Sequence, residues 1–210
     1  PERIEVFRRI VATCGARQAL VSDDIASKAG SHLADLPLAG FSQVLREGSQ
    51  APPAARASTA EAIAYLQFTS GSVGTPKGVV VKQSNVLANL RQIASRFRLA
   101  QGLATVTWLP YFHDQGLVGG LLLPVFLAGT CRTMAPASFV QRPMHWIENV
   151  AATRAVFSGG PNFAYELCAH AVERDGPRED LDLSAWTAAF ISSQRARKAA
   201  PSASSGWEML

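Results

Sequence analysis

The chain has 210 residues, of which 48% are hydrophobic and 17% are charged, and its formal net charge is +4. This length and hydrophobic content suit one sizeable core or part of a larger domain, so we expect a globular protein. The basic residues are spread along the sequence, apart from the RARK run at 195–198, and this argues against nucleic acid as a partner.

The cysteines and the apolar runs indicate in which cellular compartment the protein is expected. Cys14, Cys131 and Cys168 lie far apart and form no Cys-x-x-Cys pair, which indicates neither a disulfide framework nor a zinc site. We expect reduced thiols in a cytoplasmic protein. No apolar run approaches the roughly 18 residues that span a bilayer, so we expect no transmembrane segment. The chain starts without Met and directly in a helical pattern, which we interpret as a piece cut from a longer protein.

The first predicted element is an amphipathic helix over residues 2–13, because apolar residues recur there at helical spacing and Gly15 follows as a stop signal. The residues that share this helical face are Ile4, Phe7, Ile10 and Val11. Residues 18–22 are then predicted to form a short buried strand. From residue 31 to residue 60 the periodicity fades, and the stretch APPAARAST is typical of a proline-containing connection.

Two apolar strands follow, over residues 62–68 and 79–82, and a short polar loop separates them. A strand, a tight glycine loop and a strand predict a hairpin whose tip carries the polar groups. Ser84 is predicted to cap the next helix, which runs to about Arg98. The residues of this helix that are predicted to face inward are Val86, Leu87, Leu90 and Ile93.

The rest of the chain, up to residue 190, alternates between strands and helices. The polar turn YFHDQG follows a strand over 105–109, and Pro143 is predicted in the first turn of a helix over 144–153, where its missing N–H costs nothing. Further strands are predicted at 130–135, 155–158 and about 187–190, and further helices at about 117–127 and at 163–174. This alternation predicts an α/β fold in which helices cover a sheet.

The hairpin loop, within FTSGSVGTPKGVVV at 68–81, combines hydroxyls, glycines and one lysine. Such hydroxyls, with N–H groups that glycines leave accessible, can wrap a polyphosphate while the lysine supplies a compact positive charge. The candidate phosphate-binding residues are Thr69, Ser70, Gly71, Ser72, Gly74, Thr75 and Lys77. A structural hairpin explains the glycines, but it does not explain the hydroxyls together with the lysine.

The loop is not a Walker phosphate loop. Counted from Gly71, the second glycine of that motif is replaced by Pro76, and Lys77 is followed by Gly78. A strand also follows where the Walker loop needs a helix, whose N–H groups complete the phosphate site.

Four stretches resemble a known family. YLQFTSGSVGTPKGVVV is similar to the phosphate-binding signature of the adenylate-forming superfamily, which includes acyl-CoA synthetases, peptide-synthetase adenylation domains and luciferases. WLPYFHDQGLVGGLLLPVFLAG, QRPMHWIENV and SGGPNFAYELC resemble, in that order, segments of the fatty acyl-AMP ligases, also called long-chain fatty-acid–AMP ligases. The resemblance covers about Glu2 to Phe190, well under half of a complete member. It implies that residues 1–190 are a partial AMP-binding N-terminal domain and that the small C-terminal domain is absent.

The resemblance implies a two-step activation of a fatty acid. The fatty carboxylate attacks the α-phosphorus of ATP, which gives acyl-adenylate and pyrophosphate. The acyl group then passes to the phosphopantetheine thiol of an acyl carrier protein, often for polyketide or lipopeptide assembly. Neutralising the phosphate charge requires positioned N–H groups, hydroxyls, lysine and Mg²⁺, and the Mg²⁺ ligands are not expected in this chain.

The same resemblance assigns roles to two turns. His113, the catalytic candidate, is implied to lie near the reacting carboxylate, and Asp114 is implied to hold its turn. We expect His113 to position the carboxylate and not to act as a general base, because a fatty carboxylate is already ionised near neutral pH. A structural histidine and a helix cap are the alternatives for this pair.

The second turn follows a predicted strand, a place where α/β sheets tend to bind ligands. Its residues are Ser158, Gly159, Gly160, Pro161 and Asn162. The resemblance places this turn beside the acyl channel and the adenosine, and a plain helix-entry turn is the alternative. Trp108, Trp146 and Trp186 are predicted to pack in the core or in a pocket wall.

The sequence departs from the family in several places. Members usually carry threonine where Val73 stands, histidine where Gln83 stands and often methionine where Gln115 stands. Residues 191–210 do not resemble the family, and we expect an unstructured or out-of-frame tail that follows a frameshift or a premature stop. As an isolated chain it is expected to form negligible acyl-adenylate. An acyl-CoA ligase fragment, a peptide-synthetase adenylation fragment and an inactive remnant are the rival interpretations.

Overall fold

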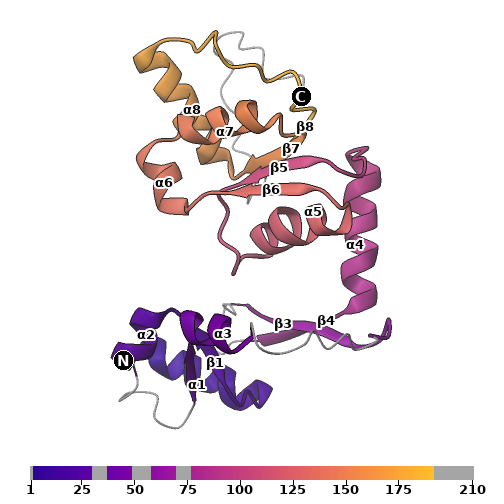
Figure 1. Cartoon of the computed structure of the whole chain (residues 1–210), viewed down its shortest axis with the longest axis vertical. Helices are drawn as coiled ribbons and strands as arrows, with labels where there is room; N and C mark the ends of the chain where they lie inside the picture. The colour runs from indigo at the N-terminus through magenta and orange to yellow at the C-terminus, as the bar shows by residue number, and fades with distance from the viewer. Residues whose placement is uncertain (1, 30–36, 49–57, 70–76, 192–210) are drawn as a thin grey trace. The chain divides into compact units, whose positions relative to one another are not determined.

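The computed structural model describes residues 2–29, 37–48, 58–69 and 77–191 (Figure 1). The chain divides into two compact units, Pro1–Val86 and Leu87–Leu210. The predicted character of residues 191–210 stays a prediction, since all but the first of them lie outside the described residues.

The first unit begins with helix α1, Glu2–Cys14, and with a small parallel pair of strands. These strands are β1, Ala19–Val21, and β2, Leu38–Gly40. The predicted first helix is confirmed, and its apolar face is half-buried. The strand predicted over 18–22 is confirmed as β1, but its predicted burial is wrong, because Leu20 is 55% exposed and, in the part of the chain that the structure describes, β1 pairs with β2 alone.

The first unit also contains two short helices that the sequence did not predict. They are α2, Asp23–Ala29, and α3, Phe41–Gly48. Asp23 joins them, because its Oδ1 and Oδ2 accept hydrogen bonds from the backbone N–H and the hydroxyl of Ser42, at 3.1 and 2.6 Å. These two bonds hold the pKa of Asp23 below its ordinary value and satisfy N-terminal groups of α3.

The predicted hairpin is confirmed. Strands β3, Ile63–Thr69, and β4, Lys77–Lys82, pair antiparallel, with Thr69 opposite Lys77 at the loop end. At the other end, Lys82 Nζ lies 2.7 Å from Glu61 Oε2. The hairpin therefore has one charged pair at its base and a lysine at the tip.

Helix α4, Gln83–Arg96, follows the hairpin directly. The prediction that Ser84 caps it is wrong, because the helix begins one residue earlier and Asn85 Oδ1 accepts the N–H of Lys82 at 2.9 Å. Leu90 is buried as predicted, but Leu87 is 38% exposed and lies outside the covered face.

The second unit contains a four-stranded parallel sheet in the order β6-β5-β7-β8. The strands are β5, Ala104–Thr107; β6, Thr130–Thr133; β7, Phe157–Gly160; and β8, Ala188–Ile191. Helices α6, Pro136–Gln141, α7, Met144–Thr153, and α8, Asn162–Asp175, lie on one side of it, and α5, Leu123–Phe126, lies on the other (Figure 1). The predicted α/β fold is confirmed.

Three details of these helices differ from the prediction. The helix predicted over 117–127 begins as a π-helix, η1, at Gly116–Leu122, and continues as α5. Pro143 is the N-cap of α7 and not a residue of its first turn. Helix α6 was not predicted, because its six residues are too few to show a helical period.

The core lies between the sheet and α6, α7 and α8. Trp108 stacks on Phe139 with ring centroids 4.0 Å apart, and Trp146 meets Trp186 edge to face at 5.6 Å. All three tryptophans are buried, which confirms their predicted packing role. Burial also raises the pKa of Cys168, in this core, to about 12.

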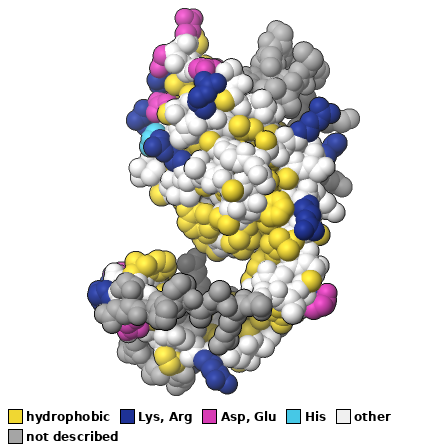
Figure 2. Space-filling view, turned by 45° about the vertical axis from the view of Figure 1, so that its right-hand side comes forward, with side chains coloured by type: hydrophobic (Ala, Val, Ile, Leu, Met, Phe, Trp, Pro, Cys, Tyr) yellow, Lys and Arg dark blue, Asp and Glu magenta, His cyan; other side chains and the backbone are white. Residues whose placement is uncertain are grey.

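Among the described residues, no helix combines the length and the apolar character needed to cross a membrane. On the face shown in Figure 2, lysine and arginine side chains are scattered over the surface.

Candidate functional site

The two predicted turns of the second unit leave the same edge of the sheet. β5 and β7 are parallel neighbours, with Thr105 opposite Phe157. The turn that contains His113 follows the carboxyl end of β5, and Pro161 and Asn162 follow the carboxyl end of β7. This edge is the usual place for ligand binding in an open parallel sheet.

Short contacts hold the His113 turn. The N–H of His113 donates to the carbonyl of Pro110 at 3.0 Å, and its carbonyl accepts the N–H of Leu117 at 2.9 Å. His113 Nδ1 lies 2.6 Å from Asp114 Oδ1, which also accepts the N–H of Gln115 at 2.8 Å. The backbone of the turn is fixed while both side chains stay 60% exposed, so the imidazole is accessible to a ligand.

Gly116 makes this turn possible. A Cβ atom at this position would collide with the carbonyl oxygen of Pro110, so no other residue fits without a shift of the backbone. The polar turn and the first residues of η1 therefore pack closely against each other.

Ser158 has a structural role in β7. It is 1% exposed, its hydroxyl donates to the carbonyl of Val106 at 2.6 Å, and its Oγ accepts the N–H of Trp146 at 2.8 Å. Both hydrogen bonds of the hydroxyl are therefore made inside the protein, where they join β7 to β5 and to α7. That the turn containing Ser158 lies beside the acyl channel and the adenosine stays a prediction.

The remaining residues of the second turn are packed closely as well. A Cβ at Gly159 would collide with the carbonyl of Phe190, and one at Gly160 would lie 2.7 Å from Trp108 Cζ2. Pro161 and Asn162 are half-buried, and Asn162 Nδ2 donates to Glu166 Oε1 at 2.5 Å. Pro161 and Asn162 are therefore the residues of this turn whose atoms a ligand can reach.

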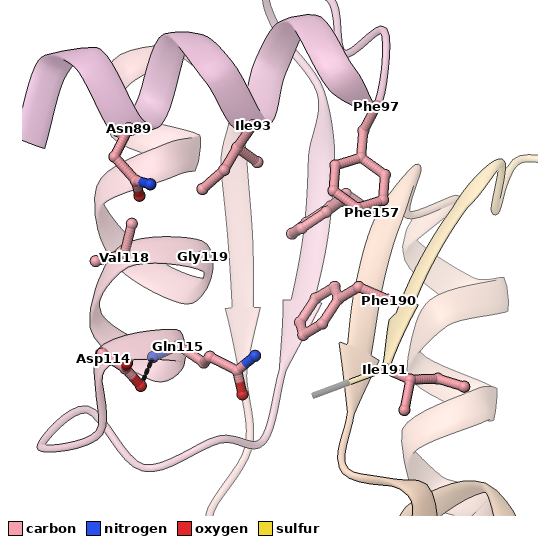
Figure 3. Close-up of a pocket in the computed structure, with 10 residues that line it drawn as sticks. All are labelled: Asn89, Ile93, Phe97, Asp114, Gln115, Val118, Gly119, Phe157, Phe190 and Ile191. Atoms are coloured by element: carbon pink, nitrogen blue, oxygen red, sulfur yellow. Dashed lines mark hydrogen bonds between the residues drawn. The ribbon is translucent and has the colours of Figure 1, made fainter. Parts of the chain in front are cut away.

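A cavity of about 330 Å³ lies between α4, η1 and the sheet (Figure 3). Its aromatic wall is continuous, because Phe157 contacts Phe97 edge to face at 5.3 Å and stacks on Phe190 at 4.9 Å. The residues that line the cavity are Asn89, Ile93, Phe97, Asp114, Gln115, Val118, Gly119, Phe157, Phe190 and Ile191. The volume and the apolar lining with a few polar groups are typical of small-molecule sites.

Sequence reasoning found only part of this cavity. Asp114 and the neighbouring His113 were singled out, whereas the aromatic wall was not. Side chains on a strand alternate between its two faces, so Phe157 faces away from the buried Ser158 next to it. Alternation along the predicted strands could have placed Phe157 on the face opposite Ser158, but it does not show that Phe97, Phe157 and Phe190 meet.

The predicted phosphate loop belongs to the first unit. Thr69 ends β3 and Lys77 begins β4, where Lys77 is exposed. Ser70, Gly71, Ser72, Gly74 and Thr75 lie outside the described residues. Within the part of the chain that the structure describes, no three His, Cys, Asp or Glu side chains are grouped so that they could hold a metal ion.

The parallel sheet, the hairpin and the cavity agree with an adenylate-forming enzyme, and the comparison with protein families gives the class. The chain belongs to the AMP-binding enzyme family, whose model matches residues 7–204. The resemblance stated from the sequence is thereby confirmed at the level of the family.

The curated relatives include a medium-chain-fatty-acid–[acyl-carrier-protein] ligase, TtuA, of Teredinibacter turnerae, which is 42% identical over 132 residues, 63% of this chain and 20% of TtuA. A long-chain-fatty-acid–AMP ligase of Mycobacterium tuberculosis is 38% identical over 142 residues, 65% of this chain and 24% of that protein. The chain thus spans about a fifth to a quarter of the length of these relatives.

Solved structures agree with the assignment of the chain to this family. The fatty acyl-adenylate ligase of Legionella pneumophila, solved with acyl adenylate and pyrophosphate, matches 93% of this chain with a TM-score of 0.80 and 33% identity. The match covers 34% of that ligase. The described fold is therefore a part of the adenylate-forming fold.

Proposed function

We propose that this chain forms part of a cytoplasmic ligase that activates a fatty acid with ATP and transfers the acyl group to an acyl carrier protein. The observation that carries the proposal is the apolar cavity that reaches Asp114, next to His113 on the turn after β5. The names of the relatives support a fatty acid as the substrate, because they describe ligases that join fatty acids to a carrier protein, to AMP or to CoA.

In this proposal the acyl chain occupies the cavity. Its lining is formed mainly by Ile93, Phe97, Val118, Phe157 and Phe190. Each methylene that leaves water for such a lining contributes about 0.8 kcal/mol. A chain of medium length therefore gains enough binding free energy to offset the cost of ordering it.

The carboxylate end of the fatty acid then lies at the His113 turn. Nδ1 of His113 lies beside Asp114, so Nε2 is the nitrogen left for a ligand, and it donates to a carboxylate when the imidazole is protonated. A carboxylate oxygen attacks the α-phosphorus of ATP, a bond to that phosphorus forms, and the bond to the pyrophosphate oxygen breaks. No general base is needed, because the carboxylate carries no proton near neutral pH.

The phosphates are assigned to the hairpin loop between Thr69 and Lys77, and the adenosine to the turn at Pro161 and Asn162. Hydroxyls, backbone N–H groups and an ammonium group stabilise the charge that develops on transferring phosphates. Mg²⁺ would add positive charge at the phosphates when bound, and no step assigned to this chain depends on a metal ligand from it.

A fatty acid and an acyl carrier protein are preferred over the rival substrates for one reason. Relatives at 38–42% identity are named for fatty acids. TtuA, at 42%, is also named for a carrier protein, whereas a putative ligase of Mycobacterium leprae, at 40%, is named for CoA. The adenylation domains of peptide synthetases match at 20–22% identity, which shows the fold alone. Transfer to CoA and an inactive remnant remain as outcomes of the tests.

Binding of dodecanoate to the chain, measured by calorimetry, tests the assignment of the cavity. Gly119 faces the open space, where a Cβ would meet only Phe157 Cε1, at 3.8 Å. We expect Gly119→Phe to fill the cavity and to weaken binding at least about tenfold, through lost burial of the acyl chain. Val125→Phe, at a 77% exposed position of α5, is the matched control. Unchanged binding in a folded Gly119→Phe variant would refute the assignment.

A further inference from the structure

We propose that Gln115 selects fatty acids that carry a hydroxyl group close to the carboxyl group. The inference rests on the proposed function, because it takes the cavity as the acyl site. It adds the class of fatty acid and the residue that recognises it.

Gln115 places a carboxamide in a mainly apolar cavity, whose other polar lining residues are Asn89 and Asp114. Its side chain extends from the start of the helix across the open space toward Phe190 and Ile191 (Figure 3). Its backbone N–H donates to Asp114 Oδ1 at 2.8 Å, which fixes the residue on the His113 turn. This bond fixes the backbone of Gln115, from which the side chain enters the cavity (Figure 3).

This carboxamide has no partner for its donor and acceptor atoms among the residues that the structure describes. Gln115 is half-buried, and Phe157, Phe190 and Ile191 across the cavity offer no polar side-chain atom. A purely hydrocarbon chain bound there would cover the amide and leave it unpaired, which costs free energy. A ligand hydroxyl can both donate to the amide oxygen and accept from the amide nitrogen.

The position of Gln115 along the chain indicates where that hydroxyl lies on the ligand. Gln115 is two residues after His113, the residue assigned to the carboxylate. A side chain at this place reaches the first carbons of the acyl chain and not its far end. Glutamine offers both a donor and an acceptor at this point, whereas a hydrocarbon side chain offers neither. A β-hydroxy fatty acid carries its hydroxyl at this end of the chain, two carbons from the carboxyl group.

Calorimetry on the full chain with β-hydroxydodecanoate and dodecanoate tests the inference. We expect the hydroxy acid to bind about tenfold more tightly, as one satisfied hydrogen bond predicts. In Gln115→Met, which nearly conserves volume, the ratio is expected to fall to about one. Gln141→Met makes the same change at an exposed residue outside the cavity and is expected to keep the ratio.

The possible results separate the two proposals. Equal binding of both acids to the unaltered chain, or a preference that persists in Gln115→Met, overturns the inference and leaves the cavity assignment standing. Equal weakening of both acids in Gln115→Met means a contact with the carboxylate and also overturns it. If circular dichroism shows a folded chain and neither acid binds, the proposed function fails and the inference fails with it.

Discussion

Trp146 donates a hydrogen bond from Nε1 to Oγ of Ser158 at 2.8 Å, in the centre of the core. The indole belongs to α7 and the hydroxyl to β7, and both residues are at most 1% exposed. The hydroxyl donates in turn to the carbonyl of Val106 on β5. One serine thus joins a helix to the two strands from which both candidate turns leave.

Replacing this serine should destabilise the fold. In Ser158→Ala the buried N–H of Trp146 loses its acceptor, and we expect the free energy of unfolding to fall by about 1–3 kcal/mol. Urea unfolding followed by tryptophan fluorescence measures the change. Ser95→Ala, at an exposed position of α4, is the control and should change stability by less than about 0.5 kcal/mol. Equal effects of the two substitutions would disprove the structural role of Ser158.

Two neighbouring glycines of η1 should respond oppositely to alanine. A Cβ at Gly120 would lie 2.9 Å from Thr107 Cγ2, whose side chain is buried and accepts the N–H of Leu109. We expect Gly120→Ala to lower the free energy of unfolding by about 1–3 kcal/mol through overpacking. Gly119→Ala has space, since its Cβ meets Phe157 at 3.8 Å, and should not lower it. Thermal or urea unfolding compares the pair, and a Gly120→Ala variant as stable as Gly119→Ala would contradict the packing.

The carboxylate of Glu148 gives a pH-dependent prediction. Burial raises its pKa, but hydrogen bonds from Arg178 and Arg142, at 2.9 and 2.8 Å, outweigh this and hold the pKa below its ordinary value of 4.5. Because the pKa is lower in the folded state, the ionised carboxylate stabilises the fold at any pH above its ordinary pKa. This contribution is lost as the pH falls through the lowered pKa of the folded state.

We therefore expect Glu148→Gln to reduce stability by about 1 kcal/mol near neutral pH and to have little effect in acid. The difference between the two chains should disappear as the pH falls below the ordinary pKa of 4.5. Urea unfolding across this pH range measures it. Glu173→Gln, whose side chain is 74% exposed, serves as the control. A difference that stays constant down to low pH would rule out the ion pairs as its cause.

Much of this fold could be predicted from the sequence, and the failures have physical causes. The hairpin and the alternation of the second unit carry strong periodicity, and both are confirmed. Helices α2 and α3 were missed because seven and eight residues show little helical period, and β2 lies in the stretch where the periodicity of the sequence fades. Ser84 was taken as a cap because of its residue type, whereas Asn85 makes the bond.

The candidate site was predicted less completely. The His113 turn is polar and therefore visible in the sequence, and the glycines of the following helix mark a close approach of the backbone. Phe97, Phe157 and Phe190 come together only through the packing of α4 against two strands far apart in the chain. No local pattern contains that information, because the three residues come from segments that lie far apart in the sequence.

ATP binding to the chain, measured by calorimetry, tests the central claim most directly. Lys77, at the loop end of β4, should bind phosphate, whereas Lys82, on the same strand, is paired with Glu61 at 2.7 Å. We expect Lys77→Ala to weaken ATP binding at least about tenfold, as the loss of a charged hydrogen bond predicts, and Lys82→Ala to leave it nearly unchanged. Equal ATP affinity in the unaltered chain and in Lys77→Ala, or no ATP binding by the folded chain, would contradict the assignment.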